Sequence, residues 1–132
     1  MQGNSKRFSG GCACGAVRFR ARAEPLRVGL CHCLTCRRAH GAAFNPFVVF
    51  DAAAVEVTGS PRSWFSSPGY DRQFCDACGS RVIALNGDEV EISIGSLDEI
   101  GLLEPQYESW IVRREPWLSA LDKPQHAHKR AP

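Results

Sequence analysis

The amino-acid sequence predicts a small, mainly β domain with zinc knuckles and little helix. Several segments alternate apolar and polar residues with the two-residue period of a strand, and helical patterns are sparse. Seven cysteines lie in three short clusters, two of which are followed directly by glycine. The 132 residues suit a single domain over 1–132 with a small stability margin, so bound metal would contribute materially to its stability.

Strand patterns occur in the first half of the chain. Residues 17–22 alternate apolar side chains with arginines, which predicts a half-buried strand. Residues 47–50 and 54–58 are short, apolar and rich in β-branched side chains, and Gly59 closes the second of them. We therefore expect a strand at each of the three places.

A β-hairpin is the clearest structural prediction. Residues 81–85 form an apolar, β-branched run that ends at Asn86 and Gly87, a dipeptide typical of tight hairpin turns. Residues 89–94 alternate cleanly after that turn. We expect the two runs to pair as antiparallel strands.

Patterns for the remaining elements are weaker. Residues 35–40 favour one short turn of helix, with Gly41 as its C-cap. Residues 107–112 predict a late strand, and Trp117 and Leu118 are expected to close the edge of the core. The core should extend over about 9–118, because residues 123–132 combine charged residues, histidines and prolines typical of a loose tail.

Composition and charge exclude several classes of protein. With 16 Lys and Arg against 14 Asp and Glu, the net charge of +2 gives no support to a nucleic-acid partner. No stretch approaches the roughly 18 apolar residues that a membrane helix needs, and the polar N-terminus is unlike a signal peptide. We expect a cytoplasmic location, where cysteines serve metal or thiol chemistry rather than disulfides. Nothing in the sequence indicates an oligomeric state.

Four of the cysteines, which we call the cysteine quartet, can hold one ion. Cys75 and Cys78 are separated by two residues, as in a zinc knuckle, and the glycine after them can adopt the left-handed conformation of such a turn. Cys12 and Cys14 are separated by one residue, which puts both side chains on one face of an extended segment. Together they can complete a tetrahedron that joins segments about sixty residues apart.

The other three, the cysteine triplet, are Cys31, Cys33 and Cys36. They can surround a second ion, and no eighth cysteine exists to complete its shell. A zinc with three protein ligands keeps an open position, which is typical of a reactive site and can take water, a substrate thiolate or a histidine. We expect two zinc ions per chain. An exposed triplet would hold its ion less securely, so this second site can be partly occupied or empty.

Two histidines bear on the triplet. His40 lies four residues after Cys36, so a helical turn would bring both side chains to one face and could close the site. Both zinc ions would then be structural and the chain a non-catalytic protein-binding module, which is the alternative to an enzyme. His32, between Cys31 and Cys33 on an extended segment, should point away from them and be packed or hydrogen-bonded.

Three segments of the sequence resemble the glutathione-dependent formaldehyde-activating enzyme family, which includes the centromere protein V type. They read GCACGAVR at 11–18, CHCLTCRR at 31–38 and FCDACGS at 74–80. The sequence GSLD at 95–98 and the pair Pro116 and Trp117 match weaker, later motifs. The resemblance runs from about Ser9 to Leu118, although residues 105–110 lack a histidine that the family often carries there.

The resemblance implies both a fold and an activity. The fold is an Mss4-like twisted β-sheet domain, in which the quartet holds a structural zinc and the triplet holds a catalytic one. The named activity joins glutathione to formaldehyde to give S-hydroxymethylglutathione, formally a carbon–sulfur lyase reaction. The implied partners are therefore a small thiol such as glutathione and a small aldehyde.

Candidate substrate-binding residues follow from the charges of these partners. Glutathione carries two carboxylates, and Arg37 and Arg38 follow the triplet directly, so they are the first candidates to bind one of them. Three thiolates and one Zn²⁺ sum to a negative charge, which favours activation of a nucleophile over polarisation of a carbonyl group. Weaker candidates are Arg62 and Arg72 for a carboxylate, and Phe44 and Phe47 for the pocket wall.

Overall fold

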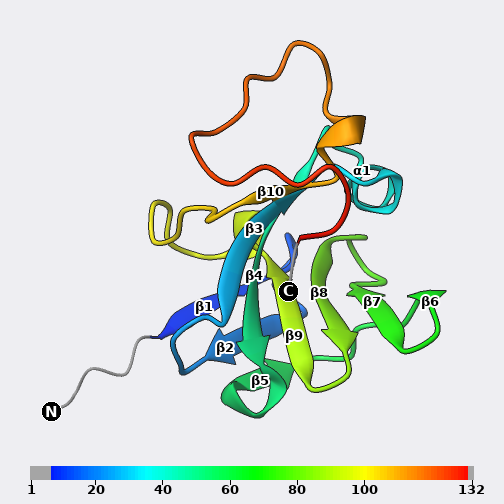
Figure 1. The fold of residues 1–132 in the computed structure, drawn as a ribbon. Helices are drawn as coiled ribbons and strands as arrows, with labels where there is room; N and C mark the ends of the chain where they lie inside the picture. The colour runs from blue at the N-terminus through cyan, green and yellow to red at the C-terminus, as the bar shows by residue number, and fades with distance from the viewer. Residues whose placement is uncertain (1–6, 131–132) are drawn as a thin grey trace, which may run out of the picture.

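The computed structural model describes residues 7–130, which form two β-sheets with one short α-helix. Figure 1 shows a large, curled sheet with a smaller sheet packed below it. The predicted mainly β fold with little helix is therefore confirmed. None of the helices within 7–130 is long and apolar enough to cross a membrane.

The smaller sheet has three antiparallel strands. In order across the sheet they are β1 (Phe8–Gly11), β2 (Arg18–Ala21) and β5 (Val55–Thr58). Phe19 and Ala21 of β2 are buried, whereas the side chains between and before them reach the surface. The alternation of apolar and arginine residues thus forms a half-buried strand, as predicted.

The larger sheet has seven strands, antiparallel except where β10 pairs with β3. In order across the sheet they are β10 (Glu108–Ser109), β3 (Arg27–Cys31), β4 (Asn45–Asp51), β9 (Glu89–Ser93), β8 (Arg81–Asn86), β7 (Tyr70–Phe74) and β6 (Phe65–Ser67). Strands β8 and β9 are the predicted hairpin. Its two turn residues are Gly87 and Asp88, one position later than expected, and Gly87 has a φ of 63°.

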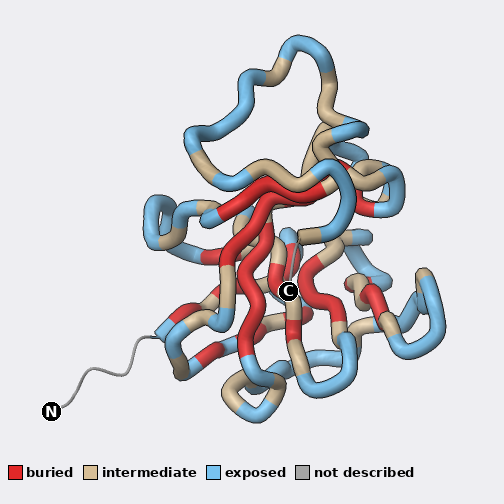
Figure 2. Tube along the Cα trace, viewed as in Figure 1, coloured by how far each residue is buried: buried red, intermediate tan, exposed pale blue. Residues whose placement is uncertain are grey.

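Strand β4 is buried on both of its faces, and this separates two cores. Val48 and Phe50 pack between the two sheets, in a cluster that also includes Cys12 of the quartet. Phe47 and Val49 point to the opposite face, where they pack with the triplet. Figure 2 shows the resulting burial along the central strands. The quartet and the triplet therefore lie on opposite faces of the larger sheet.

The helix α1 (Leu34–His40) follows β3 directly and confirms the predicted helical turn. Cys33 is its N-cap and accepts a hydrogen bond from the Cys36 N–H. Gly41 ends it with a φ of 58°, in the left-handed conformation expected of a C-cap. The 3₁₀ turns are η1 (Ala52–Ala54), η2 (Ile94–Ser96) and η3 (Ile111–Arg113).

The segment after Pro105 corrects two predictions. Of the expected strand at 107–112, only Glu108–Ser109 is a strand; Trp110 then has a left-handed φ of 56° and η3 follows. Trp117 is 71% exposed and does not close a core edge. The segment after η3, orange to red in Figure 1, forms a long loop that arches away from the sheets.

The expected loose tail is attached to the body as far as the structure describes it. Pro124 accepts a backbone hydrogen bond from Glu108, and the His126 N–H donates to the Glu108 carbonyl. His128 accepts from the Trp110 N–H at 2.8 Å. The reason is that β10 is an edge strand, whose unpaired backbone groups a returning segment can satisfy. Residues 131–132 lie outside the described part.

Candidate metal centres and substrate cavity

The quartet brings four sulfur atoms together at a spacing that suits a zinc ion. All four Sγ atoms lie within 4.8 Å of one another. The Cys12–Cys14 and Cys14–Cys75 Sγ distances are both 3.7 Å. A tetrahedral site with Zn–S bonds of about 2.3 Å needs sulfurs about 3.8 Å apart. The quartet can therefore hold a metal ion.

Two glycines shape the knuckles of the quartet. Gly15 has a φ of 85°, and its N–H donates to the Cys12 carbonyl at 3.2 Å. Gly79 has a φ of 79°, and its N–H donates to the Cys75 carbonyl at 2.7 Å. Because the left-handed region is accessible to glycine at little cost, both turns can fold sharply enough to converge their sulfurs.

Hydrogen bonds favour the thiolate form of two quartet cysteines, Cys78 and Cys12. The Ser80 hydroxyl accepts from the Ala13 N–H at 2.9 Å and lies 3.2 Å from Cys78 Sγ, so it links the two knuckles. Hydrogen bonds from Ser80 lower the pKa of Cys78 to about 5. The Val17 N–H donates to Cys12 Sγ and lowers the pKa of that thiol. At Cys14 the backbone hydrogen bond from Ala16 is outweighed by the neighbouring thiols, which raise the pKa to about 11. Thiolates are the form that binds metal.

The triplet converges through the turn between β3 and α1. Its three Sγ atoms also lie within 4.8 Å of one another. Cys31 ends β3 and accepts from the Cys33 N–H at 3.4 Å, and Cys33 accepts from the Cys36 N–H at 3.3 Å. The backbone itself thus turns the three sulfurs toward one point, and this group too can hold a metal ion.

Among the triplet thiols, Cys33 is the one that its surroundings favour as a thiolate. Hydrogen bonds from the Cys31 and Cys36 thiols lower the pKa of Cys33 to about 2. Interaction with Cys33 raises the pKa of Cys31 to about 11, and the pKa of Cys36 is raised as well by its thiol neighbours. An ion bound by all three sulfurs would displace the remaining protons.

Arg72 is the cation next to the triplet. Its side chain is 9% exposed, and its Nη1 donates to Cys36 Sγ at 3.9 Å. Its Nε donates to the Ser66 hydroxyl at 2.8 Å, and the guanidinium lies 4.5 Å from the centre of the Tyr70 ring. The sequence ranked Arg72 as a weaker candidate, but the structure brings it to the site.

No fourth protein ligand joins the triplet within residues 7–130. His40 lines two other cavities together with Arg81. Burial and the nearby cations Arg72 and Arg81 lower the pKa of His40 to about 4. His32 is buried, and its Nε2 donates to Glu108 Oε1 at 2.7 Å, which confirms that it is a hydrogen-bonded core residue.

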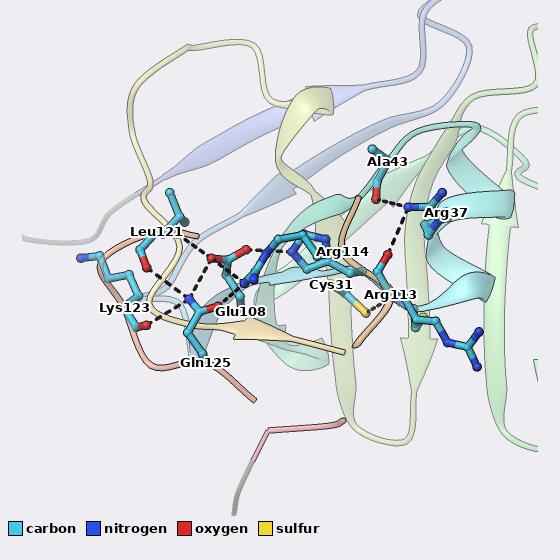
Figure 3. Close-up of polar contacts among 11 residues, drawn as sticks. Cys31, Arg37, Ala43, Glu108, Arg113, Arg114, Leu121, Lys123 and Gln125 are labelled. Atoms are coloured by element: carbon cyan, nitrogen blue, oxygen red, sulfur yellow. Dashed lines mark hydrogen bonds and ion pairs between the residues drawn. The ribbon is translucent and has the colours of Figure 1, made fainter. Parts of the chain in front are cut away.

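Glu108 fixes the segment that carries the first two triplet cysteines (Figure 3). Besides His32, its carboxylate accepts from the Leu121 N–H at 2.7 Å and from Gln125 Nε2 at 2.8 Å. Burial opposes ionisation, but the hydrogen bonds from Gln125, His32 and Leu121 prevail and lower the pKa of Glu108. The carboxylate therefore joins β3, β10 and the C-terminal segment behind the triplet.

A cavity of about 250 Å³ adjoins the triplet. Four aromatic side chains contribute to its lining: Phe47, Tyr70, Tyr107 and Trp110. Glu91 also lines it and accepts a hydrogen bond from the Tyr70 hydroxyl at 2.6 Å. Burial raises the pKa of both Tyr70 and Glu91, so both favour their protonated forms. The cavity can admit a small molecule to the sulfurs.

The first two candidates for binding a carboxylate do not line this cavity. Arg37 donates to Glu115 at 2.5 Å. It also donates to the carbonyls of Ala43 and Arg113 at 3.3 Å (Figure 3). These bonds tie α1 to the C-terminal segment, and Arg38 is exposed on the same helix. As ligands for a substrate, both remain predictions from the sequence.

Of the remaining weaker candidates, Phe44, Phe47 and Arg62, only Phe47 lines the triplet cavity. Phe47 lines the triplet cavity as expected, whereas Phe44 lies 5.9 Å from the His32 ring and lines a different cavity. Arg62 pairs through its backbone with Phe74 and is absent from the lining of the triplet cavity.

The triplet is more buried than expected, whereas the quartet is mixed: Cys12 and Cys75 are buried. Cys14 and Cys78 of the quartet are exposed. Cys31 and Cys36 of the triplet are only 8% and 4% exposed. The triplet is buried because the C-terminal segment, which was expected to be loose, packs beside it.

Several cavity residues had no signal in the sequence. Tyr70, Tyr107 and Trp110 reach the triplet from β7 and from the segment around β10, and no spacing relates them to it. Lys129 and Arg130 come from the segment expected to be a loose tail. Only the pairing of distant segments in the folded chain brings them together.

Comparisons with known proteins agree with this picture. The model of the family described as glutathione-dependent formaldehyde-activating enzyme matches residues 7–113, and so excludes the pair Pro116 and Trp117. A Schizosaccharomyces pombe protein named as an uncharacterized lyase is 30% identical over 73 residues, which are 55% of this chain. The chain spans about half the length of that relative, since the match covers 53% of it. A crystal structure of a Rhodobacter sphaeroides protein, 22% identical, shares the fold with a TM-score of 0.59 over 71% of this chain and 91% of that one.

Proposed function

Because the chain belongs to the glutathione-dependent formaldehyde-activating enzyme family, we propose that it is a zinc-dependent enzyme that joins a small thiol to a small aldehyde. This is carbon–sulfur lyase chemistry in the direction of addition. The observation that carries the proposal is the cysteine triplet, which lines a cavity and has no fourth protein ligand within residues 7–130. The name of the fission-yeast relative supports the reaction class.

We assign a zinc ion to each cysteine group. The quartet, with four thiolate ligands, has a structural role, and the triplet has the catalytic one. The three sulfurs of the triplet would hold the zinc ion at the cavity, at a position where bound zinc would favour the thiolate form of a substrate thiol. The aromatic walls of the cavity would exclude water from that position.

The addition balances without a further reactant. The thiol sulfur forms a bond to the aldehyde carbon, the π bond of the carbonyl group breaks, and the thiol proton ends on the former carbonyl oxygen. Tyr70 and Glu91, which share a hydrogen bond and favour their protonated forms, can carry that proton. Arg72 offsets the negative charge of the triplet from beside Cys36.

The family description names the substrates that we propose. They are glutathione and formaldehyde, which would give S-hydroxymethylglutathione. The cytoplasm supplies glutathione and a reducing environment, and the seven free cysteines of the chain suit it.

Exchange NMR on a mixture of glutathione and formaldehyde tests the activity. We expect the wild-type protein, carrying two zinc ions, to accelerate formation of the adduct. Cys33→Ser should keep the quartet's ion, lose the triplet's ion and lose the acceleration. If the protein with both ions bound accelerates nothing, the enzyme proposal fails and the alternative of a zinc-stabilised binding module gains support.

A further inference from the structure

The C-terminal segment completes the triplet cavity from outside the family match. That match ends at residue 113, yet Lys129 and Arg130 line the same cavity as the three cysteines. In Figure 1 the chain leaves η3 in a wide loop and returns beside β10 toward the front of the larger sheet. The cavity therefore has one part common to the family match and one part that belongs to this segment.

Specific contacts hold the returning segment in place. The Trp110 N–H donates to the His128 carbonyl at 2.8 Å, and the rings of these two residues meet edge to face at 5.0 Å. The Tyr107 ring contacts the His126 ring at 5.8 Å. Because Tyr107 and Trp110 also line the cavity, these contacts fix the position of Lys129 and Arg130 relative to it.

The basic side chains that line the cavity differ in how far they are buried and in the groups to which they donate. The inner cation, Arg72, donates to Cys36 and Ser66. Arg27 donates through both terminal nitrogens to Glu89, at 3.1 and 2.8 Å. Lys129 is exposed, so its ammonium group can meet a ligand that enters from solvent.

We propose that Lys129 and Arg130 bind a carboxylate of the thiol substrate, so that the cavity selects carboxylate-bearing thiols over neutral thiols. One molecule can reach both places, because the triplet and the two basic residues line one cavity of about 250 Å³. The inference rests on the proposed function, because it takes the ligand to be the thiol substrate. Binding of the carboxylate at Lys129 and Arg130 nevertheless requires no reaction at the triplet.

Binding measurements on the zinc-loaded protein test the carboxylate-binding site separately from the proposed enzymatic activity. Calorimetry would use glutathione, its diethyl ester, which is neutralised at both carboxylates, and S-methylglutathione, which has no free thiol. We expect wild type to bind glutathione roughly tenfold more tightly than the diester, and still to bind S-methylglutathione. The double variant Lys129→Met/Arg130→Met should bind both carboxylate-bearing ligands, glutathione and S-methylglutathione, roughly tenfold more weakly than wild type does. Its affinity for the diester should change little.

The matched control is Arg20→Met/Arg22→Met, which removes the same formal charge from exposed positions at β2 on the smaller sheet. It should bind all three ligands like wild type. Equal weakening of the diester and glutathione by Lys129→Met/Arg130→Met would overturn the inference, as would equal affinity of wild type for both. If S-methylglutathione binding depends on Lys129 and Arg130 while formaldehyde addition is not accelerated, the anion site stands and the proposed function fails.

Discussion

Glu108 is a buried carboxylate that holds three segments of the chain together. It is 2% exposed and accepts hydrogen bonds from His32, Leu121 and Gln125. Replacing this buried carboxylate is costly, because its hydrogen-bond donors would lose their acceptor. Its position beside His32 makes it the support of the backbone between Cys31 and Cys33.

Glu108→Gln should lower the free energy of unfolding by about 2–4 kcal/mol, because it removes a buried charge from donors that remain in place. Glu104→Gln is the matched control. Its side chain is 76% exposed and pairs with Lys123 at the surface, so the change should be within about 0.5 kcal/mol. Urea unfolding of both variants measures the difference. Equal effects would show that the Glu108 network adds no stability.

Single residues were predictable from the sequence where the chemistry is encoded by spacing. The sulfurs of the triplet lie together because one local turn converges them, and each half of the quartet is likewise a local knuckle, although tertiary contacts bring its halves together. His32 is hydrogen-bonded because neighbours on a strand point to opposite faces. Arg72 and Lys129 reach the triplet through tertiary contacts, which no local spacing reveals. Which arginine serves the site could not be inferred from its distance along the chain.

At the scale of elements, residues 95–98, the GSLD sequence of the family resemblance, attach the end of η2 to strands β1 and β2. A Cβ atom at Gly10 of β1 would lie 2.1 Å from the Ser96 carbonyl oxygen and 2.9 Å from Leu97 Cα. Asp98 also accepts two hydrogen bonds from Arg18 of β2. Close backbone contact and an ion pair thus attach this segment to the smaller sheet.

Gly10→Ala should destabilise the protein by about 2–3 kcal/mol, because backbone atoms rather than a flexible side chain occupy the space of the new methyl group. Gly95→Ala is the control from the neighbouring turn, since nothing lies within 4 Å of a Cβ there. It should change stability by no more than about 0.5 kcal/mol. Thermal unfolding compares them, and similar melting temperatures would contradict the proposed close contact.

Elements were predictable where one face is buried and the other solvated. Strands β2 and β9 show this alternation and lie where expected. Strand β8 has three consecutive buried residues, and it was predictable from its apolar run and the hairpin turn that ends it. Strand β3 was missed because four of its five residues are buried, so it has no polar alternation. Strand β10 is only two residues long and is defined by its parallel pairing with β3, which local sequence does not encode.

At the scale of the whole molecule, the two sulfur groups lie on opposite faces of the larger sheet. They also differ in how far apart along the chain their cysteines lie. Cys14 and Cys75, whose sulfurs are 3.7 Å apart, are separated by 61 positions. The triplet spans one turn between β3 and α1. Closing the longer loop restricts the unfolded chain more, so the quartet should contribute more to stability.

Cys75→Ser should therefore lower the free energy of unfolding by about 3 kcal/mol or more, with loss of one zinc ion. Cys33→Ser should also lose one ion but cost only about 1 kcal/mol, since it interrupts a local site. Elemental analysis and thermal unfolding, repeated after chelation and after zinc is restored, measure both effects. Greater destabilisation by Cys33→Ser would reverse the assignment of the structural site.

The long separation between the halves of the quartet also sets an order of events during synthesis on the ribosome. The triplet is complete once Cys36 has emerged, so it can capture an ion before the second half of the quartet has emerged. The quartet must wait for Cys78, and the segment carrying Lys129 and Arg130 emerges later still. A nascent chain would thus be able to bind an ion at the triplet first and at the quartet second, and it would gain the basic wall of the cavity after both.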